Sequence, residues 1–536
     1  MKSKIIRFLL LTAIAINLIN CAKKGNPTGG EKDVTPPVVT GTLPKPFTTN
    51  FKEEKIKITF DEYIKLNDLQ KQLIVSPPLK NIPEIKPQGT AAKYLEIELK
   101  DTLLENTTYV FNFGQSIVDN NEGNPNSFYK YVFSTGDYID SLTLDGYVVD
   151  AIKNKPEAFV SVMLYKVDST FTDSIIYKKP PIYITNTLDS STTFQLTNLK
   201  EGKYMLIGMK DIGNNYLFNQ KTDQIAFISD FVEIPTDSVY KLTLFKEVSN
   251  FRAAQPSLVA KNRIIFGYEG DYKDMKINLL SEAPDDFKYH ITKNIQKDTL
   301  NYWFTPFEAD SLIFTVGTLK TIDTFTVRMK ELYADTLVFA QDRTKTFGIG
   351  GTVKINASTP IIKVNADSIS VINKDSIPQE FVSTLDTLNN QISLKWESTA
   401  NERYRITIKE NTFEDFFGSI NDSIIEYGVT TKSLADLGSI RIKLKNVESY
   451  PIMVQLTNEQ GEIVYETYSE EAQPFYDFSD ISPANYLLRI IFDANGNGKW
   501  DTGNYLLKTQ PERISYYPTV IELKPNWELE QEFTLD

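Results

Sequence analysis

The chain of 536 residues contains one cysteine, Cys21, and one histidine, His290. A single cysteine rules out intramolecular disulfides, so stability has to come from packed cores. The same shortage excludes zinc sites built from His and Cys, and nucleophilic triads that need a histidine base. We expect His290, in a strand-like Tyr-His-Ile-Thr setting, to pack or face solvent rather than to catalyse.

The sequence also lacks long, capped segments with helical periodicity, and no glycine-rich loop opens a helix as phosphate sites require. Paired carboxylates of the glycosidase kind carry no local signature, and none here sits in a recognisable catalytic frame. A hydrolase is therefore the third-ranked hypothesis. We predict that the protein is not an enzyme.

Positive charge is in short supply as well. Residues 1–20 contain Lys2, Lys4 and Arg7 and no acid, so without them 54 basic side chains face 70 acidic ones and the formal charge is −16. An acidic surface without a basic stripe repels phosphate backbones and anionic lipid alike. We expect no nucleic-acid partner, and membrane attachment would have to come from a lipid group.

The first residues supply such an attachment. Three basic residues within the first seven precede the apolar run Phe8–Ile19, which is too short to cross a bilayer, and Cys21 follows at its end. This pattern resembles a bacterial lipoprotein signal, although Asn20 departs from the small residue usual before the cysteine. The resemblance implies that residues 1–20 are removed and that acyl groups such as palmitate on Cys21 hold the protein on outer-membrane lipid.

Residues 21–35 are rich in turn formers and lack apolar periodicity, which predicts a flexible tether. Cys21 is followed by Ala22, Lys23 and Lys24 instead of the acidic run that resembles a surface-export signal in some lipoproteins. This favours the periplasmic face of the outer membrane, and both faces stay open.

Beyond the tether, apolar and polar residues alternate with a period of two. Such runs include Ile56-Ile58-Phe60, Leu95-Ile97-Leu99, Val160-Val162-Leu164 and Ile440-Ile442-Leu444. This alternation is typical of half-buried antiparallel strands. The predicted fold class is all-β, a tandem array of β-sandwiches.

Four motifs lie in residues 36–137. They are Ile58-Thr59-Phe60-Asp61-Glu62-Tyr63-Ile64, Leu104-Glu105-Asn106-Thr107-Thr108-Tyr109, Ile117-Val118-Asp119 with Gly123-Asn124, and Tyr131-Val132-Phe133-Ser134-Thr135-Gly136. Together they resemble the SbsA-type bacterial Ig-like domain. The interval from Tyr109 to Gly123 recurs from Tyr404 to Gly418, which predicts a second, divergent Ig-like domain at 346–432.

A second kind of module also occurs twice. Residues 138–248 resemble the prealbumin-like, carboxypeptidase-regulatory-like β-sandwich through Leu144-Asp145-Gly146-Tyr147-Val148-Val149-Asp150, Phe194-Gln195-Leu196, Leu199 and Gly202-Lys203-Tyr204. In residues 433–536, Phe478, Ile481, Tyr486 and Asp493 repeat the spacing of Leu196, Leu199, Tyr204 and Asp211. Residues 249–345 form a β-rich unit of uncertain type, whose Trp303, Phe304, Phe307, Phe314 and Phe325 we expect in its core.

One loop has the composition of a metal site. Oxygen side chains at Asp493, Asn495, Asn497 and Asp501, together with the Lys499 carbonyl, resemble a calcium loop. Asn504 stands where a bidentate glutamate is expected, so a metal-free polar turn stays open as the alternative. The loop at Asp211 has lost its middle ligand, and the bend from Asp119 to Asn124 is favoured as a solvated turn.

Lipidation plus repeated sandwiches without catalytic parts leads to the main hypothesis. We expect a non-enzymatic, lipid-anchored scaffold or accessory subunit, whose partner is an integral outer-membrane protein complex. The alternative is a surface carbohydrate-binding or adhesive protein, suggested by 28 tyrosines and 32 phenylalanines. In that case the partner would be a glycan. No cofactor is expected apart from calcium.

Overall fold

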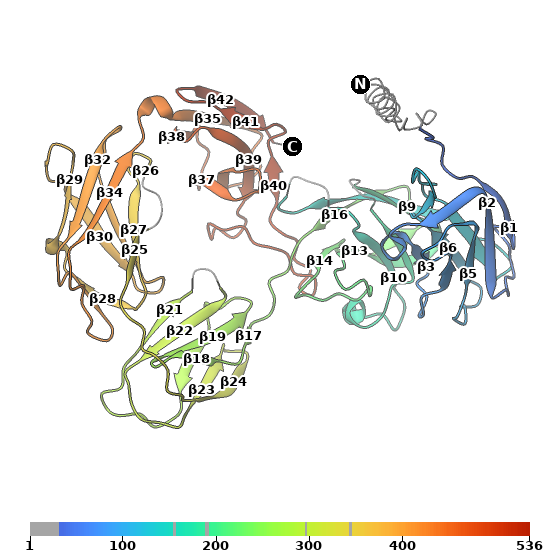
Figure 1. The fold of residues 1–536 in the computed structure, drawn as a ribbon. Helices are drawn as coiled ribbons and strands as arrows, with labels where there is room; N and C mark the ends of the chain where they lie inside the picture. Colours follow the sequence, from blue (N-terminus) through green and yellow to red (C-terminus); the bar gives the residue numbers. More distant parts are fainter. Residues whose placement is uncertain (1–31, 154–156, 188–191, 295–296, 342–345, 536) are drawn as a thin grey trace, which may run out of the picture. The chain divides into compact units, whose positions relative to one another are not determined.

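The computed structural model describes residues 32–153, 157–187, 192–294, 297–341 and 346–535 (Figure 1). The signal segment, Cys21 and the tether as far as residue 31 lie outside these ranges. Strands dominate the described residues, which confirms the all-β prediction. The short helical segments are α2 (Leu69–Gln72), η1 (Asp173–Tyr177), η2 (Ala366–Ser368) and η3 (Leu434–Asp436). Across the described ranges, no helix combines the length and the apolar character that crossing a membrane requires.

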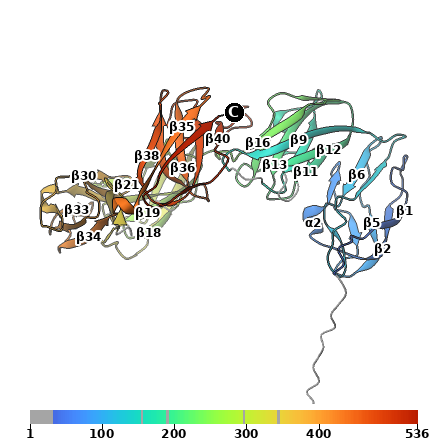
Figure 2. The same ribbon diagram turned by 90° about the horizontal axis from the view of Figure 1, so that it is seen from above.

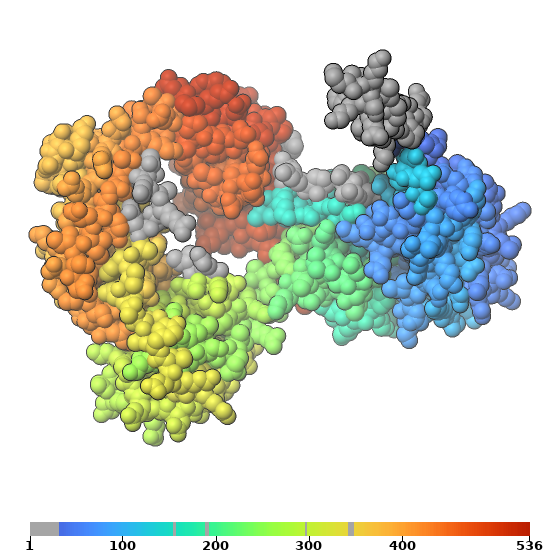
Figure 3. Space-filling view, in the orientation of Figure 1, coloured from blue at the N-terminus to red at the C-terminus, as the bar shows by residue number. Residues whose placement is uncertain are grey.

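The chain divides into two compact units. The first consists of the chain up to Thr143 with Ile182–Ile184 and Thr197–Lys200, and the second contains the remainder. Each sandwich comes from one continuous stretch of sequence, so neighbouring atoms within it have similar colours in Figure 3. The five predicted ranges, 36–137, 138–248, 249–345, 346–432 and 433–536, stay predictions as domain boundaries. The boundary at residue 346 divides a sheet, because β25 (Phe339–Gln341) pairs with β27 (Thr352–Ala357) of the following sandwich.

The first sandwich has one sheet ordered β1-β2-β5-β4, with β7 beside β2, and a second sheet ordered β3-β6-β8. Its strands are β1 (Val39–Leu43), β2 (Lys55–Leu66), β3 (Ile74–Ser76), β4 (Glu84–Lys86), β5 (Ala92–Glu98), β6 (Thr108–Asn112), β7 (Ile117–Asp119) and β8 (Lys130–Ser134). The alternation predicted for Ile56, Ile58, Leu95 and Ile97 places all four side chains in the core, each with no exposed surface.

The second sandwich pairs a sheet ordered β11-β10-β13-β14, with β15 beside β13, with a sheet ordered β12-β9-β16 (Figure 2). Its strands are β9 (Leu142–Asp150), β10 (Ser161–Lys166), β11 (Tyr183–Asn186), β12 (Thr193–Leu199), β13 (Gly202–Lys210), β14 (Gln224–Phe227), β15 (Val232–Ile234) and β16 (Val239–Leu244).

The last sandwich has the same strand order. Its sheets run β37-β36-β39-β40, with β41 beside β39, and β38-β35-β42. The strands are β35 (Gly438–Lys445), β36 (Ile452–Thr457), β37 (Ile463–Ser469), β38 (Tyr476–Ile481), β39 (Ala484–Phe492), β40 (Ile514–Tyr516), β41 (Ile521–Leu523) and β42 (Glu528–Thr534). The residues with matching spacing therefore occupy matching strands, because Leu196 and Phe478 lie in β12 and β38 while Tyr204 and Tyr486 lie in β13 and β39.

In the sequence, the third and fourth sandwiches come between the second and the last. The third has sheets β17-β19-β22-β21, with β18 beside β19, and β20-β23-β24. Its strands are β17 (Arg252–Ala253), β18 (Ser257–Ala260), β19 (Arg263–Glu269), β20 (Lys276–Leu279), β21 (Tyr289–Lys293), β22 (Thr299–Phe304), β23 (Ser311–Gly317) and β24 (Ile322–Arg328). Of the five aromatic residues expected in its core, Trp303, Phe304 and Phe314 are buried, while Phe307 and Phe325 are half-buried against it.

The fourth sandwich has sheets β25-β27-β31-β30 and β26-β34-β32-β29, with the pair β28-β33. Its strands are β25 (Phe339–Gln341), β26 (Thr346–Phe347), β27 (Thr352–Ala357), β28 (Ile361–Val364), β29 (Ile369–Ile372), β30 (Phe381–Asp386), β31 (Gln391–Trp396), β32 (Arg403–Ile408), β33 (Phe413–Asp415) and β34 (Ile425–Thr431).

The first and fourth sandwiches share a hydrogen-bond pattern around a buried tyrosine. The hydroxyl of Tyr109 accepts from the Leu104 backbone N–H at 2.8 Å, and that of Tyr404 accepts from the Thr399 N–H at 2.8 Å. A tyrosine that bonds to backbone a few residues upstream is a hallmark of Ig-like domains. The two tyrosines that begin the equal intervals thus make the same hydrogen bond, each to the backbone five residues upstream.

Not every strand pair is antiparallel. In the second sandwich β16 runs parallel to β9, and in the last one β42 runs parallel to β35. Parallel neighbours need a long crossover between them, which periodicity within one strand cannot reveal. In both sandwiches the first strand and the closing strand are the parallel neighbours.

Candidate functional site

The predicted calcium loop follows β39 and is organised around a buried carboxylate. Asp493 has no exposed surface, and its Oδ1 accepts from the backbone N–H of Gly496 at 2.9 Å and of Asn497 at 3.1 Å. Its Oδ2 accepts from the Gly498 N–H at 2.7 Å. Gly496 and Gly498 have φ values of 71° and 68°, a region that favours glycine. The turn therefore depends on an acid at position 493, which accepts the backbone hydrogen bonds, and on glycines at 496 and 498, which adopt the positive φ values.

Three other predicted ligands come together on the outer side of the loop. The amide Nδ2 atoms of Asn495 and Asn497 donate to Oδ2 of Asp501 at 2.5 and 2.6 Å. Lys499 takes part through its backbone N–H, which donates to Oδ1 of Asn497 at 2.8 Å. The structure thus gathers these side chains, with Asp493 committed to backbone N–H groups.

Sequence reasoning missed one member of this loop, Glu512. Its carboxylate accepts from the Ala494 N–H at 2.8 Å and from the Asp501 N–H at 3.0 Å. Burial raises the pKa of Glu512, and the negative charges of Asp493 and Asp501 raise it further. A bound cation would offset this repulsion. Among the described residues, however, no three His, Cys, Asp or Glu side chains form a group suited to a metal ion.

Calcium binding at this loop stays a prediction. With a dissociation constant on the order of 1 mM, typical of weak extracellular sites, about 10 mM calcium should stabilise the last sandwich by about 1.4 kcal/mol. Thermal unfolding followed by tryptophan fluorescence, with calcium or with a chelator, measures this. Asp501→Asn removes one charge at nearly constant shape and should abolish the difference. Equal unfolding temperatures with and without calcium would contradict the prediction.

The corresponding loop of the second sandwich has a different environment. Oδ2 of Asp211 accepts from the N–H groups of Asn215 at 2.8 Å and Tyr216 at 2.6 Å, as a turn anchor does. Burial raises the pKa of Asp211, and the nearby Asp223 adds to the effect. The expectation that calcium is absent from this loop remains a prediction.

In the first unit, Asp119 anchors the polar bend before the closing strand. Its Oδ1 accepts from the N–H groups of Asn121, Glu122 and Gly123 at 2.8, 2.7 and 3.1 Å, and its Oδ2 accepts from Asn124 at 2.6 Å. Burial by itself raises the pKa of Asp119, but these four donors outweigh burial and hold the pKa below its usual value.

This lowered pKa predicts a pH dependence. The ionised Asp119 stabilises the bend above the unfolded-state pKa of about 3.9, and the stabilisation is lost as the pH falls through the lower folded-state pKa. Asp119→Asn should therefore lower the urea midpoint of the peptide around β7 at pH 7, and by much less at about pH 3. Pulsed hydrogen exchange measures both midpoints, with the exposed Glu122→Gln as control. An equal decrease of the urea midpoint at both pH values would refute the predicted role of the Asp119 charge.

His290 lies in β21, where the third sandwich meets the fourth. Its Nε2 is 3.4 Å from the Thr387 carbonyl oxygen, and its ring centroid is 6.2 Å from that of Phe416. The residue is half-buried. These contacts show that His290 packs against its neighbours, which is one of the two settings expected from the sequence.

A contact that the sequence did not indicate joins the last sandwich to the second. We call residues 502–511 the strap. It lies between the Asp493 loop and β40. Its Tyr505 has no exposed surface, and its ring lies 5.4 Å from that of Phe227, edge to face. The Tyr505 hydroxyl donates to the Asp173 carbonyl at 2.9 Å, and the Tyr505 N–H donates to Glu247 Oε1 at 2.5 Å.

The surface that receives Tyr505, which we call the socket, belongs entirely to the second sandwich. It consists of Asp173, Met205, Phe227, Phe245 and Glu247. Lys508 of the strap pairs with the Asp173 carboxylate at 2.6 Å, and Thr502 Oγ1 donates to the Lys246 carbonyl at 2.6 Å. Burial raises the pKa of Tyr505, with the Asp173 charge contributing. One aromatic side chain and several polar bonds thus fix the strap.

A second contact between the same sandwiches lies beside the first. The buried Arg489 donates from Nε to Gln455 Oε1 at 2.6 Å and from Nη1 to the Ile152 carbonyl at 3.5 Å. The Tyr516 hydroxyl donates to the same carbonyl. This contact uses strands β36, β39 and β40, which belong to the sheet of the last sandwich.

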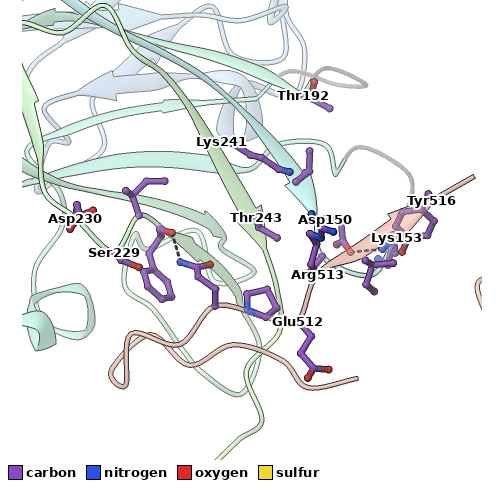
Figure 4. Close-up of a pocket in the computed structure, with 17 residues that line it drawn as sticks. Asp150, Lys153, Thr192, Ser229, Asp230, Lys241, Thr243, Glu512, Arg513 and Tyr516 are labelled. Carbon is purple, nitrogen blue, oxygen red and sulfur yellow. Dashed lines mark hydrogen bonds between the residues drawn. The ribbon is translucent and has the colours of Figure 1, made fainter. Parts of the chain in front are cut away.

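Between the two contacts lies a cavity of about 750 Å³ (Figure 4). Gln510 and Pro511 of the strap form one wall, and Gln510 Nε2 donates to the Phe227 carbonyl at 2.9 Å. Six charged residues line the cavity: Asp150, Lys153, Asp230, Lys241, Glu512 and Arg513. Three are acidic and three basic, so their formal charges cancel.

Asp150 is the buried charged residue of this cavity. Its Oδ1 accepts from the N–H groups of Ile152 at 2.9 Å and Lys153 at 2.8 Å, while its Oδ2 is buried and has no hydrogen-bond partner among the described residues. Burial raises the pKa of Asp150. The carboxyl is thus held by a local turn at the end of β9.

The comparisons with known proteins bear on the first sandwich. Residues 33–135 match the model of the bacterial Ig-like domain. This match confirms the Ig-like resemblance predicted for residues 36–137. The lipoprotein and prealbumin-like resemblances stay predictions. No curated protein matches the chain.

Several solved structures are similar over longer stretches at low identity. The surface layer protein SbsC, domains 1–6, is 12% identical with a TM-score of 0.16, over 91% of this chain and 68% of that one. The I9–I11 tandem of titin is 8% identical with a TM-score of 0.13, over 53% and 100%. A Salmonella alpha-2-macroglobulin mutant is 9% identical with a TM-score of 0.14, over 90% and 42%. At such values, none of these matches supports an inference about function.

Proposed function

We propose that the protein is a non-enzymatic, lipid-anchored protein of the cell envelope, which serves as a scaffold or accessory subunit of an outer-membrane protein assembly. The observation that carries the proposal is the order of its first segments. A lipoprotein-like signal ends at Cys21, and the Ig-like match begins at residue 33 after a short tether. Acyl groups would hold the chain at the membrane, and the sandwiches would extend into water.

The surface of the first unit offers apolar side chains for such a partner. Leu43, Phe47 and Ile82 are 73%, 62% and 81% exposed. Large apolar side chains at loops and strand ends are typical contact points of Ig-like domains. The partner we propose is an integral outer-membrane protein, because the lipid anchor would confine the chain to the same membrane.

Affinity capture tests the proposal. A C-terminally tagged chain is purified from native membranes in mild detergent and its partners are identified by mass spectrometry, while protease shaving of intact cells reports the face of the membrane. Stoichiometric recovery of an integral outer-membrane protein is the expected result. Recovery of the chain alone would count against a scaffold.

The second candidate is a surface carbohydrate-binding or adhesive protein. Tyr63 and Tyr94 of the first unit are 56% and 39% exposed, as sugar-stacking residues have to be. A lysine ammonium group lies over each ring, with Lys93 Nζ 5.5 Å from the ring centroid of Tyr63 and Lys57 Nζ 4.5 Å from that of Tyr94. A ligand would have to displace these lysines. Binding of the purified protein to a glycan array tests this candidate. Absence of binding to any envelope or host glycan would rule it out.

A further inference from the structure

We propose that the strap is a releasable contact, which opens while both sandwiches stay folded and thereby opens the cavity between them. The strap, residues 502–511, belongs to the last sandwich, but the buried cluster that the described residues form in the core of this sandwich contains no residue of the strap. That core is made by strands on both sides of the strap, including Tyr486, Ile490 and Phe533. Release of the strap therefore leaves the core of its own sandwich intact.

The strap has a local structure of its own. The backbone N–H of Asn504 donates to the Thr509 carbonyl at 2.8 Å, and the Thr509 N–H donates back to the Asn504 carbonyl at 2.9 Å. At the tip of this turn, Leu506 and Leu507 are 55% and 76% exposed. These two bonds do not depend on the socket, so the turn can persist when Tyr505 leaves.

The socket is likewise held by its own sandwich. Phe227 lies at the end of β14, where it pairs with Ile207 of β13, and Phe245 is joined to Ile225 by two backbone hydrogen bonds of 2.9 Å. Glu247 keeps a second partner, since its Oε2 accepts from Gln220 at 2.8 Å. Loss of Tyr505 would expose the socket without removing its framework.

The fit at the socket is nevertheless specific. A Cβ at Gly503 would lie 2.6 Å from the Phe245 ring and 2.7 Å from the Thr509 carbonyl, so only glycine fits there. The intramolecular attachment of strap and socket makes their effective concentration high, so few contacts suffice to close the strap. Gln510 and Pro511 form a wall of the cavity and would leave with the strap.

Hydrogen exchange on the full mature chain tests the proposal, read by mass spectrometry. In the wild type, peptides of the strap should exchange on the order of tenfold or more faster than peptides of β10 and β36, because a local opening costs less than unfolding. Tyr505→Ala should accelerate the strap peptides by a further factor of about ten, with the socket peptides 224–228 and 243–247, β10 and β36 unchanged.

A milder variant keeps the test independent of folding. Lys508→Glu places a repelling charge next to Asp173 on a side chain that is 35% exposed, and should also accelerate the strap. Adding Asp173→Lys should restore its protection. The proposal is overturned if the wild-type strap exchanges only as slowly as β36, if Tyr505→Ala leaves strap protection unchanged, or if β10 and β36 lose protection together with the strap.

Discussion

Replacing Cys21 by serine is expected to move the protein from the membrane fraction to the soluble fraction. If acyl groups on Cys21 are the only anchor, their loss removes the buried hydrocarbon that holds the chain on lipid, at about 0.8 kcal/mol per methylene. Without residues 1–20 the chain is acidic and would not adsorb to anionic lipid by itself. The membrane-bound share should fall by more than about tenfold.

Cell fractionation with immunoblotting measures this share, and metabolic labelling with a palmitate analogue reports acylation directly. Ala22→Ser is the matched control, since it alters the neighbouring residue and keeps the cysteine. Retention of Cys21→Ser in the membrane fraction would mean that a protein partner or another segment holds the chain there. Such a result would separate the anchoring hypothesis from the scaffold hypothesis.

Replacing Gly146 by alanine is expected to unfold the second sandwich more readily. Gly146 is buried in β9, and an added Cβ would lie 2.4 Å from both the Phe194 ring and the Tyr240 carbonyl. The carbonyl belongs to the paired strand β16 and cannot rotate away, so the pair itself would have to move. Overpacking of this kind should cost about 3 kcal/mol of unfolding free energy.

The urea midpoint of the β9 peptide, read by pulsed hydrogen exchange, measures the cost. Gly428→Ala in β34 is the control, because no atom of the described residues lies within 4 Å of the added Cβ and the change should stay within about 0.5 kcal/mol. An unchanged midpoint for Gly146→Ala would show that β9 and β16 can separate freely at this position.

Local patterns predicted the strands and not the contacts between distant parts. The alternation at Ile56 and Ile58 indicated a buried face, because successive side chains of a strand point to opposite faces and every second one therefore points into the core. Likewise, Tyr109 and Tyr404, which begin the two equal intervals, each accept a hydrogen bond from the backbone five residues upstream. In each case the information lies within a few residues of sequence.

Two features of the candidate site could not be predicted in this way. Glu512 holds the Asp493 loop although the chain passes through the whole strap between them, so no fixed spacing marks it. Tyr505 bonds to Glu247, which lies 258 positions earlier, and nothing around either residue indicates a contact. Such pairs are set by tertiary packing, on which a linear pattern carries no information.

The parallel closing strands have a consequence for a chain that is anchored at one end and held by a partner at the other. In the second sandwich, β9 enters and β16 leaves side by side in the same direction, paired over six positions from Val239–Asp145 to Leu244–Asp150. Tension applied to the two ends pulls these strands along their length in opposite directions. All the bonds between them then share the load at once in shear, instead of breaking one after another. The last sandwich, with β35 and β42 paired over seven positions, would resist stretching in the same way.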